Sequence, residues 1–377
     1  MKIKLKNLIS SLLFCFVLTG CWDYRDVNKR SINLSVGVDE SKGTIMYDAE
    51  IANNIPSGGE ETTKLKSNIN IYDATGRQFE DTRLDYQRRK PFPDFSGAVR
   101  VVVFSKNFAE KGIIPYINRI NLLYGYRKSL LIVVCRESTK ALFNEKIKDD
   151  ISVGYSIENT IESLSSMGMA IQVSEKDILS YIALKNVGYL IPYVTNENKS
   201  IVLLGYGVMK ESKLIDIIDM RNSFPILYLL SKKPYIFSAI PSPSNNKNNI
   251  SYINTLNKRK ITTSYNNNKV AINIDLALKT QIVYEYEIEP LSDADRKIIE
   301  NQISTIAKNS IETLIKKSQQ EYQSDIFQLY RYFRADNIEA SKTIDWKTAY
   351  PNAAINVKVS TKITNTNFLD PNASKKY

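Results

Sequence analysis

The fold of the C-terminal half is indicated by one continuous stretch, residues 268–322, which reads NKVAINIDLALKTQIVYEYEIEPLSDADRKIIENQISTIAKNSIETLIKKSQQEY. Residues 268–289 alternate apolar and polar side chains, which predicts a long strand with one buried face. Ser292 suits a helix N-cap, and Asp293 and Asp295 favour the positive end of the helix dipole. Apolar side chains then recur at helical spacing, namely Ile299, Ile303, Ile306, Ile311, Leu314 and Tyr322. We therefore expect an amphipathic helix of roughly thirty residues, or about 45 Å.

The neighbouring segments complete an α+β unit around this strand and helix. Residues 241–249, PSPSNNKNN, are the clearest break in the chain and predict a mobile loop. Beyond the long helix, residues 325–334 predict a shorter helix, and the alternating residues 353–364 predict a closing strand. A sheet packed against one long amphipathic helix is expected for the C-terminal half.

The N-terminal half is expected to contain a mixed sheet with helices packed on it. The alternating residues 31–39 and 44–52 flank Glu40–Gly43 and predict a β-hairpin. Polar residues 56–68 predict a surface loop. Apolar runs predict further strands at 98–104, 128–135, 188–194 and 200–210. Such strands, interleaved with helices, are typical of a mixed sheet.

Helical spacing falls between these strands in three places. Residues 73–89 have Phe79, Leu84 and Tyr86 as their apolar members, and residues 107–123 are helical on either side of Pro115. Two short helices are expected over residues 157–183. The second begins at Ser174–Asp177, which resembles a capping box with Asp in place of the usual Glu or Gln.

The chain has 377 residues, too many for one ordinary hydrophobic core. We expect a multi-domain α+β fold of two to three mixed α/β domains. The expected division is a leader over residues 1–20, an N-terminal α/β domain over 21–195 and a C-terminal α+β domain over 196–377, which includes the loop 241–249. The turn over residues 195–199 marks the boundary between the two domains.

The first 20 residues have the pattern of a signal peptide. Residues 1–7 are basic, and the apolar run over residues 8–18 is too short to cross the roughly 30 Å bilayer core as a helix. Leu18–Cys21 resembles the bacterial lipobox, in which the small Gly20 admits a peptidase and the thiolate of Cys21 accepts a diacylglyceryl group. We expect signal cleavage between Gly20 and Cys21 and lipid attachment at Cys21, with N-acylation of its amino group left open. An uncleaved anchor helix with a chance cysteine is the alternative.

The remaining thiols are expected to play no part in chemistry or in a disulfide. Cys15 lies in the leader, and Cys135 ends the apolar run SLLIVVC. With Cys21 acylated, the mature chain has no second thiol to pair with Cys135. We interpret Cys135 as a small buried hydrophobic residue, with a reactive thiol as the alternative. Trp22, directly after the anchor, suits the level of the lipid headgroups.

The residue types exclude most catalytic and metal sites. The chain has no histidine, so no Ser-His-Asp set, Cys-His set or His-ligated metal is expected. Phosphate-binding loops and nucleophile elbows are absent, and Gly205-Tyr206-Gly207 lacks the third glycine of a nucleotide site. The carboxylate pairs Glu60-Glu61 and Asp149-Asp150 lie in polar stretches, and none stands out as a glycosidase pair. We expect no catalytic residue, no metal and no cofactor.

The charge balance indicates membrane or protein partners. Lys and Arg number 51 against 40 Asp and Glu, a formal net charge of +11. Such a balance suits nucleic acid, an anionic membrane surface or an acidic partner. No long basic block is interleaved with aromatic residues, apart from the short runs Arg88–Lys90 and Lys258–Lys260. Together with the export signal, this pattern disfavours nucleic acid.

Four blocks in a fixed order resemble the Ger(x)C lipoprotein family, the C subunits of spore germinant receptors. The first is Gly20–Asp23 with Arg25-Asp26, followed by Gly37–Asp39. The others are Phe108–Ile113, residues 205–218 (GYGVMKESKLIDII), and a run from Glu321 through Asp325–Phe327 to Trp346. The order of the blocks behind a lipobox carries the resemblance over essentially the whole mature chain.

The chain departs from the family pattern at a few positions. Gly207 replaces an alanine, Met209 replaces an aromatic residue and Gln328 replaces a glycine. A Gly-His that is often found near residue 95 is replaced by Ser96–Ala98. Within the fourth block, Asp325 and Trp346 are expected to hold the C-terminal core together rather than to bind a ligand.

The resemblance implies a lipoprotein on the outer face of the spore inner membrane, assembled with an integral-membrane A subunit and a transporter-like B subunit. Such a receptor senses small nutrients and triggers germination, and its C subunit has a multi-domain α+β fold without a catalytic site. Direct contact between this subunit and the nutrient is left open. One alternative is a solute-binding lipoprotein of a transporter, normally two doubly wound lobes joined by a hinge. The other is a cell-envelope hydrolase.

Overall fold

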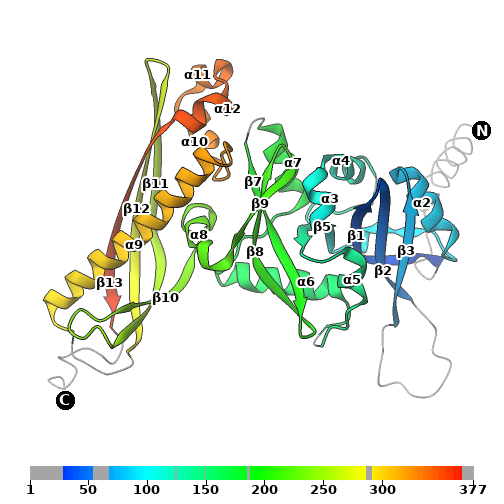
Figure 1. Ribbon diagram of the computed structural model, residues 1–377, viewed down its shortest axis with the longest axis horizontal. Helices are drawn as coiled ribbons and strands as arrows, with labels where there is room; N and C mark the ends of the chain where they lie inside the picture. The colour runs from blue at the N-terminus through cyan, green and yellow to red at the C-terminus, as the bar shows by residue number, and fades with distance from the viewer. Residues whose placement is uncertain are drawn as a thin grey trace, which may run out of the picture.

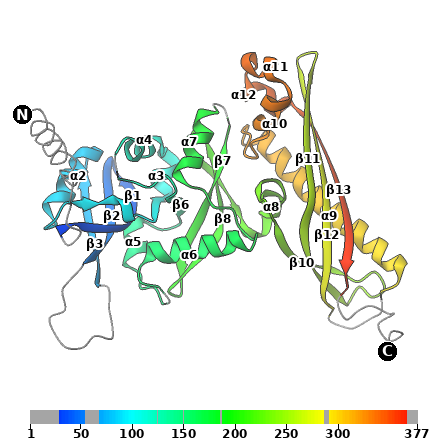
Figure 2. The ribbon, with the colours of Figure 1, turned by 180° about the vertical axis from the view of Figure 1, so that it is seen from behind.

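The computed structural model describes residues 29–53, 68–123, 125–148, 150–184, 187–285 and 291–366. The molecule is elongated and has two sheet-containing units along its long axis (Figure 1). The first unit comprises the described residues up to 219, and the second comprises those from 235 onward. The view from behind shows helix α8 (Phe224–Leu230) between the two units (Figure 2).

The first unit is built on one mixed sheet. Its strands are β1 (Ser31–Ser41), β2 (Thr44–Asn53), β3 (Asn68–Gly76), β4 (Asp94–Phe95), β5 (Val101–Ser105), β6 (Leu131–Cys135), β7 (Tyr189–Glu197), β8 (Ser200–Lys210) and β9 (Lys213–Asp219). In the described part of the chain they are ordered β3-β2-β1-β5-β6-β7-β8-β9, with β4 paired to β1. The central strands β1, β5, β6 and β7 run parallel, β4 is also parallel to β1, and the pairings toward β3 and toward β9 are antiparallel.

Helices cover both faces of this sheet because its central strands are apolar on both faces. They are α2 (Phe79–Arg88), α3 (Lys106–Lys111), α4 (Ile114–Leu122), α5 (Thr139–Asn144), α6 (Val153–Ser166) and α7 (Glu175–Ala183), with a 3₁₀ turn η2 (Ser96–Ala98). Every residue of β5 and β6 is buried. Alternate residues of these strands face α3, α4 and α7 on one side and α5 and α6 on the other.

The second unit is a four-stranded sheet with one long helix. Its elements are β10 (Tyr235–Pro241), β11 (Asn249–Asn266), β12 (Lys269–Glu285), α9 (Asp293–Gln320), α10 (Leu329–Asp336), α11 (Ile338–Thr343), α12 (Trp346–Ala349), η4 (Tyr350–Asn352) and β13 (Ala354–Asn365). The 3₁₀ turn η3 (Met220–Asn222) lies between the two units, before α8. Strands β10, β11 and β12 are antiparallel, and β13 runs parallel to β12. Helix α9 crosses one face of this sheet (Figures 1 and 2). Every second side chain of β12 from Val270 to Ile282 is buried.

The expected fold class is confirmed, as are several local predictions. Strands β1 and β2 form the expected hairpin around Glu40–Gly43. Ser292 caps α9 and forms a full capping box with Asp295, and Ser174 does the same with Asp177 at α7. These features are local, so the sequence pattern was enough to predict them.

Other predictions are wrong. The helix expected over 73–89 begins only at Phe79, because residues 68–76 pair with β2 as strand β3. The helical stretch 107–123 is interrupted at Gly112, with φ +122°, and not at Pro115. Pro115 lies in the first turn of α4, where a proline removes no helical hydrogen bond.

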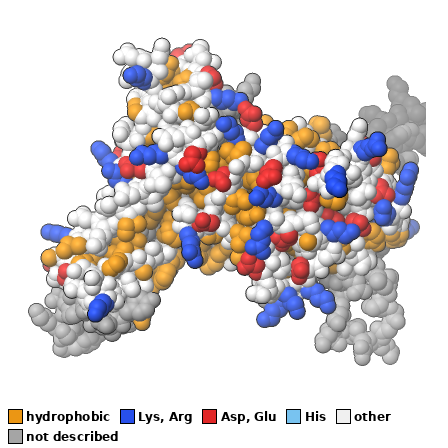
Figure 3. Space-filling model, in the orientation of Figure 1, with side chains coloured by type: hydrophobic (Ala, Val, Ile, Leu, Met, Phe, Trp, Pro, Cys, Tyr) orange, Lys and Arg blue, Asp and Glu red, His pale blue; other side chains and the backbone are white. Residues whose placement is uncertain are grey.

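Three side chains expected on buried helix faces lie elsewhere. Leu84 and Ile306 are 48% and 49% exposed. Hydrophobic side chains are visible on the surface of the arm that carries α9 (Figure 3). Tyr322 lies just beyond the end of α9, and its hydroxyl donates to Asp216 Oδ2 of the first unit at 2.7 Å. It joins the two units instead of continuing the helix face.

Strands β3, β9, β10 and β11 and helix α8 were not predicted. The longest of them, β11, contains mainly polar residues and so lacks a clear strand pattern. The half of β11 next to its turn into β12 is only partly buried, which allows these polar residues there. The domain boundary expected at residues 195/196 falls in the β7–β8 hairpin. The chain passes from the first sheet to the second between β9 and β10. Of the predicted loop 241–249, residues 242–248 connect β10 to β11, with Ser242 and Asn248 buried. The mobility of this connection stays a prediction.

Candidate functional site

The expected lipid site, Cys21 with cleavage between Gly20 and Cys21, lies outside the described residues. Four other positions named in the sequence analysis also lie outside them, namely Cys15, Trp22, the pair Glu60-Glu61 and Asp149. Cys135 is described and is fully buried in the core on the α5–α6 side of the sheet. Its thiol donates to the carbonyl oxygen of Glu137 at 3.0 Å, and burial raises its pKa well above the usual value. These observations fit a structural thiol, not a reactive one.

The described residues contain no grouping of three or more His, Cys, Asp and Glu side chains that would hold a metal ion. Gly205 and Gly207 lie within strand β8, so they form no phosphate-binding loop. A Cβ on Gly205 would approach the carbonyl oxygen of Ile218 to 2.0 Å, and φ here is +150°. Close strand pairing explains this glycine.

Two segments of the four sequence blocks, Gly37–Asp39 and Phe108–Ile113, stabilise the packing of the first unit. A Cβ on Gly37 would lie 2.6 Å from Cβ of Thr139, so glycine lets α5 approach β1. Asp39 is buried and accepts hydrogen bonds from the Ser105 hydroxyl and from the Glu40 backbone N–H. Gly112 ends α3 with a positive φ that favours glycine.

The fourth block forms a buried polar centre in the second unit. Asp325 accepts from the backbone N–H groups of Leu329 and Tyr330, at 3.0 and 2.8 Å, and from the Trp346 indole N–H at 3.1 Å. Burial raises the pKa of Asp325, while these three donors oppose that shift. Asp325 therefore holds the start of α10 against α12. The expected structural role of Asp325 and Trp346 agrees with these contacts.

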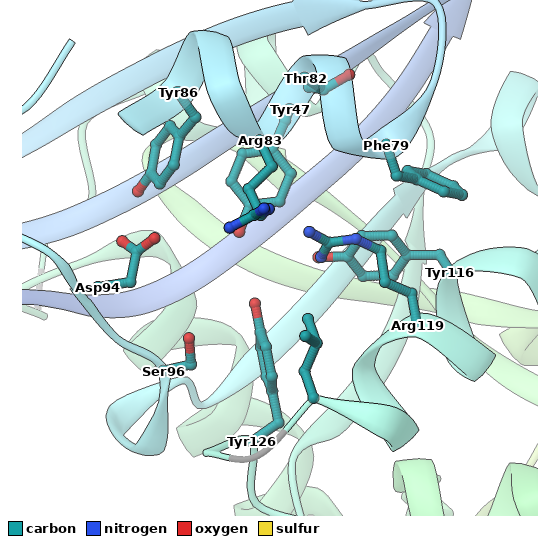
Figure 4. A pocket seen from close by; sticks show the side chains of 11 residues that line it. Tyr47, Phe79, Thr82, Arg83, Tyr86, Asp94, Ser96, Tyr116, Arg119 and Tyr126 are labelled. Carbon is teal, nitrogen blue, oxygen red and sulfur yellow. The ribbon is translucent and has the colours of Figure 1, made fainter. Parts of the chain in front are cut away.

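A small pocket in the first unit is a candidate for binding, because charged and aromatic side chains from several elements line it. We call it the tyrosine–arginine pocket; it has a volume of about 70 Å³. Strand β2, helices α2 and α4, strand β4, turn η2 and the segment after α4 supply its lining, which consists of Tyr47, Phe79, Thr82, Arg83, Tyr86, Asp94, Ser96, Tyr116, Arg119, Leu123 and Tyr126. Figure 4 shows the tyrosine, arginine and aspartate side chains arranged around one central space.

One wall of this pocket satisfies its own polar groups. The Tyr86 hydroxyl donates to Asn33 Oδ1 at 3.1 Å, and Asn33 Nδ2 donates to Asp94 Oδ1 at 3.0 Å. Lys90 pairs with Asp94 and lies over the Tyr86 ring, with its nitrogen 3.7 Å from the ring centroid. Only 1% of the Lys90 side chain is exposed, and burial lowers its pKa although Asp94 opposes the shift.

The opposite wall contains two buried polar groups that lack a hydrogen bond of normal geometry to the described residues. The Tyr116 hydroxyl and Arg119 Nε are buried and make no hydrogen bond of normal geometry to any described residue. Tyr116 is 1% exposed, and burial raises its pKa well above the usual value, so its O–H is a donor at neutral pH. Arg119 Nε lies 3.4 Å from Glu80 Oε1, and Arg83 Nε lies 2.7 Å from Glu80 Oε2. Two guanidinium groups thus share one carboxylate.

Sequence reasoning did not find this pocket. Its lining comes from short segments between residues 47 and 126, and neither the tyrosines nor the arginines form a local motif. The only hint is at Ser96, where the chain departs from the family pattern and which now lines the pocket. No signal in a single sequence would have joined these positions.

No described helix has the length and apolar character needed to span a membrane.

Two family models together match most of the chain. Residues 23–196 match the spore germination protein N-terminal domain, and residues 204–367 match the spore germination B3/GerAC-like C-terminal domain. The chain belongs to the family of germinant receptor C subunits. The two matches meet near the β7–β8 hairpin, although the first sheet continues through β9.

Individual relatives agree with this family. Spore germination protein GerQC of Bacillus cereus is 19% identical over 373 residues, which cover 96% of this chain and 98% of that protein. Spore germination protein A3 of Bacillus subtilis (strain 168) is 23% identical over 215 residues, 55% of this chain and 56% of that protein. The crystal structure of the GerBC protein matches with a TM-score of 0.54 and 16% identity, covering 88% of this chain and 97% of that one. This last match supports the fold.

Proposed function

We propose that this chain is a non-enzymatic, lipid-anchored subunit of a nutrient germinant receptor in the spore inner membrane. Family membership over both halves of the chain is the observation that carries the proposal. The leader sequence adds the mode of attachment, through a diacylglyceryl group on Cys21 after cleavage behind Gly20. The protein would then lie on the outer face of that membrane.

The family relationship also supports the partners. We propose assembly with an integral-membrane A subunit and a transporter-like B subunit, so that the whole complex responds to nutrient and triggers germination. The absence of histidine from the chain fits a role without catalysis. The solute-binding alternative is not favoured, because a four-stranded sheet with one crossing helix is not a doubly wound lobe.

Deletion of the gene tests the role in germination. Dormant spores without the protein are expected to lose or narrow their response to a panel of nutrients, while still germinating with a non-nutrient trigger that bypasses receptors. Normal germination across the panel, in a strain without a second copy of the receptor, would contradict the proposal.

The anchor is tested separately by Cys21→Ala. The variant is expected to leave the membrane fraction or to keep its leader, because no thiolate is available for acylation. Cys15→Ala is the matched control, since it changes a leader cysteine outside the lipobox and should leave attachment unchanged. A Cys21→Ala protein that is cleaved and still membrane-bound would disprove lipid attachment at this residue.

Affinity purification from solubilised spore membranes tests the partners. The wild-type chain is expected to bring down two integral-membrane proteins, and the Cys15→Ala variant should do the same. Recovery of the chain alone, under conditions that keep other membrane complexes intact, would argue against assembly with A and B subunits.

A further inference from the structure

The tyrosine–arginine pocket has an excess of hydrogen-bond donors on one wall. The Tyr116 O–H and Arg119 Nε–H are buried and make no hydrogen bond of normal geometry to any described residue; Tyr116 lies beside the Tyr47 and Tyr126 hydroxyls, and Arg119 Nε lies 3.4 Å from Glu80 Oε1. The Tyr126 hydroxyl and the Arg83 guanidinium point toward the same space (Figure 4). Leaving buried donors unpaired is unfavourable, so the wall is suited to an added acceptor.

The charges of the pocket favour an anion. Arg83, Lys90 and Arg119 face Glu80 and Asp94, which leaves one positive charge in excess. Asp94 is already engaged by Lys90 and Asn33. A carboxylate is an acceptor-only group that satisfies several converging donors at once, and its bonds to arginine are strong.

The size and walls of the pocket limit the rest of the ligand. The rings of Phe79 and Tyr47 and the side chain of Leu123 form apolar walls. A volume of about 70 Å³ accommodates about five non-hydrogen atoms, if each takes the space of one ordered water. Leu123 is 40% exposed and the Arg83 side chain 44%, so the pocket reaches the surface at these residues.

We propose that the tyrosine–arginine pocket is a binding site for a small organic carboxylate with a short apolar body. The carboxylate accepts from Tyr116, Tyr126 and Arg119, and the apolar body lies against Phe79, Tyr47 and Leu123. This inference goes beyond the proposed function, because it depends neither on the lipid anchor nor on the receptor partners.

Calorimetric titration of the mature full chain in detergent tests this site. Propionate is the probe, and propionamide, which has the same shape without the charge, is the matched control ligand. We expect saturable one-to-one binding of propionate at about 1 mM or tighter, which lies within the affinity available to so small a ligand. Benzoate is expected to bind at least tenfold more weakly, since it exceeds the pocket.

Tyr116→Phe is the most informative variant because it removes one hydroxyl and keeps the ring. We expect propionate affinity to fall about tenfold or more, the usual effect of losing a hydrogen bond to a charged group. The melting temperature should change little, because the hydroxyl makes no hydrogen bond of normal geometry to any described residue. Arg119→Met should abolish detectable binding, whereas Arg88→Met, on the exposed side of α2, should not alter it.

Several results would overturn the proposal. They are the absence of propionate binding, equal affinity for propionate and propionamide, and undiminished binding by Tyr116→Phe. A pocket filled only by water would give no heat of binding with any probe. If Arg119→Met does not fold, the propionate affinity of Tyr116→Phe still tests the proposal. Failure here would leave the germination and partner experiments unaffected.

Discussion

Asp48 is predicted to make the stability of the first unit depend on pH. It lies on β2, is 2% exposed and accepts from the Thr139 hydroxyl at 2.6 Å. Burial raises its pKa to about 6 from 3.8, while the Thr139 hydrogen bond opposes the shift. Because the native protein keeps this proton to higher pH than the unfolded chain, the free energy of unfolding falls as pH rises from about 4 to about 6.

The size of this effect follows from the two pKa values. A difference of about two units corresponds to about 3 kcal/mol of lost stability at pH 7, about 1.5 kcal/mol at pH 5 and under about 1 kcal/mol at pH 4. Asp48→Asn keeps the shape of the side chain and an oxygen for Thr139 but cannot ionise. Its stability relative to the native protein should therefore increase by about 2 kcal/mol between pH 4 and pH 7.

Urea unfolding followed by far-ultraviolet circular dichroism at pH 4, 5, 6 and 7 measures this difference. Any constant effect of the new amide group cancels, because only the change with pH is compared. Asp275→Asn, at an exposed position on β12, is the control, because it makes the same chemical change away from the buried site. A difference for Asp48→Asn that does not change with pH would refute the reasoning about burial.

Three further substitutions test other contacts through thermal or urea unfolding. Gln328 has a left-handed backbone with φ +59°, so Gln328→Gly should raise the free energy of unfolding by about 1 kcal/mol. Gln302→Gly, within α9, should lower it by about as much. A loss of stability in Gln328→Gly would contradict the argument from its positive φ. Asp325→Ala should lower the free energy of unfolding by about 3 kcal/mol, because it leaves the N–H donors of Leu329, Tyr330 and Trp346 unpaired. A loss under about 1 kcal/mol would show that these donors find other acceptors. Ser292→Ala should lower stability by about 1 kcal/mol through loss of the capping box, and Ser304→Ala, in the helix interior, should have a smaller effect.

The local pattern predicted elements that are stabilised by neighbours in the sequence. The alternation in β12 and the cap at Ser292 each depend on residues within a few positions of one another. The pattern was wrong where distant strands compete for the same segment. Residues 73–76 carry helical spacing but pair with β2. Backbone hydrogen bonds to an existing sheet outweighed a weak local preference there.

Helix α9 contains both apolar residues that are buried as their spacing predicts and one that is not. Ile299 and Ile303 face the sheet as their spacing predicts, while Ile306 is exposed. A helix has a turn of 3.6 residues, and a narrow sheet covers only part of its circumference. Which apolar positions are covered depends on where β13 and β12 lie, and that is a tertiary property.

The sequence by itself determined the α+β class, the capped helix, the buried thiol of Cys135 and the family, because these follow from periodicity, residue type and the order of short blocks. Tertiary structure alone decided the tyrosine–arginine pocket. Tyr47, Arg83, Tyr116 and Tyr126 come from separate segments, and each is an unremarkable residue in its own segment. Their donors converge only because β2, α2 and α4 pack around one space, and unpaired buried donors are a property of that packing.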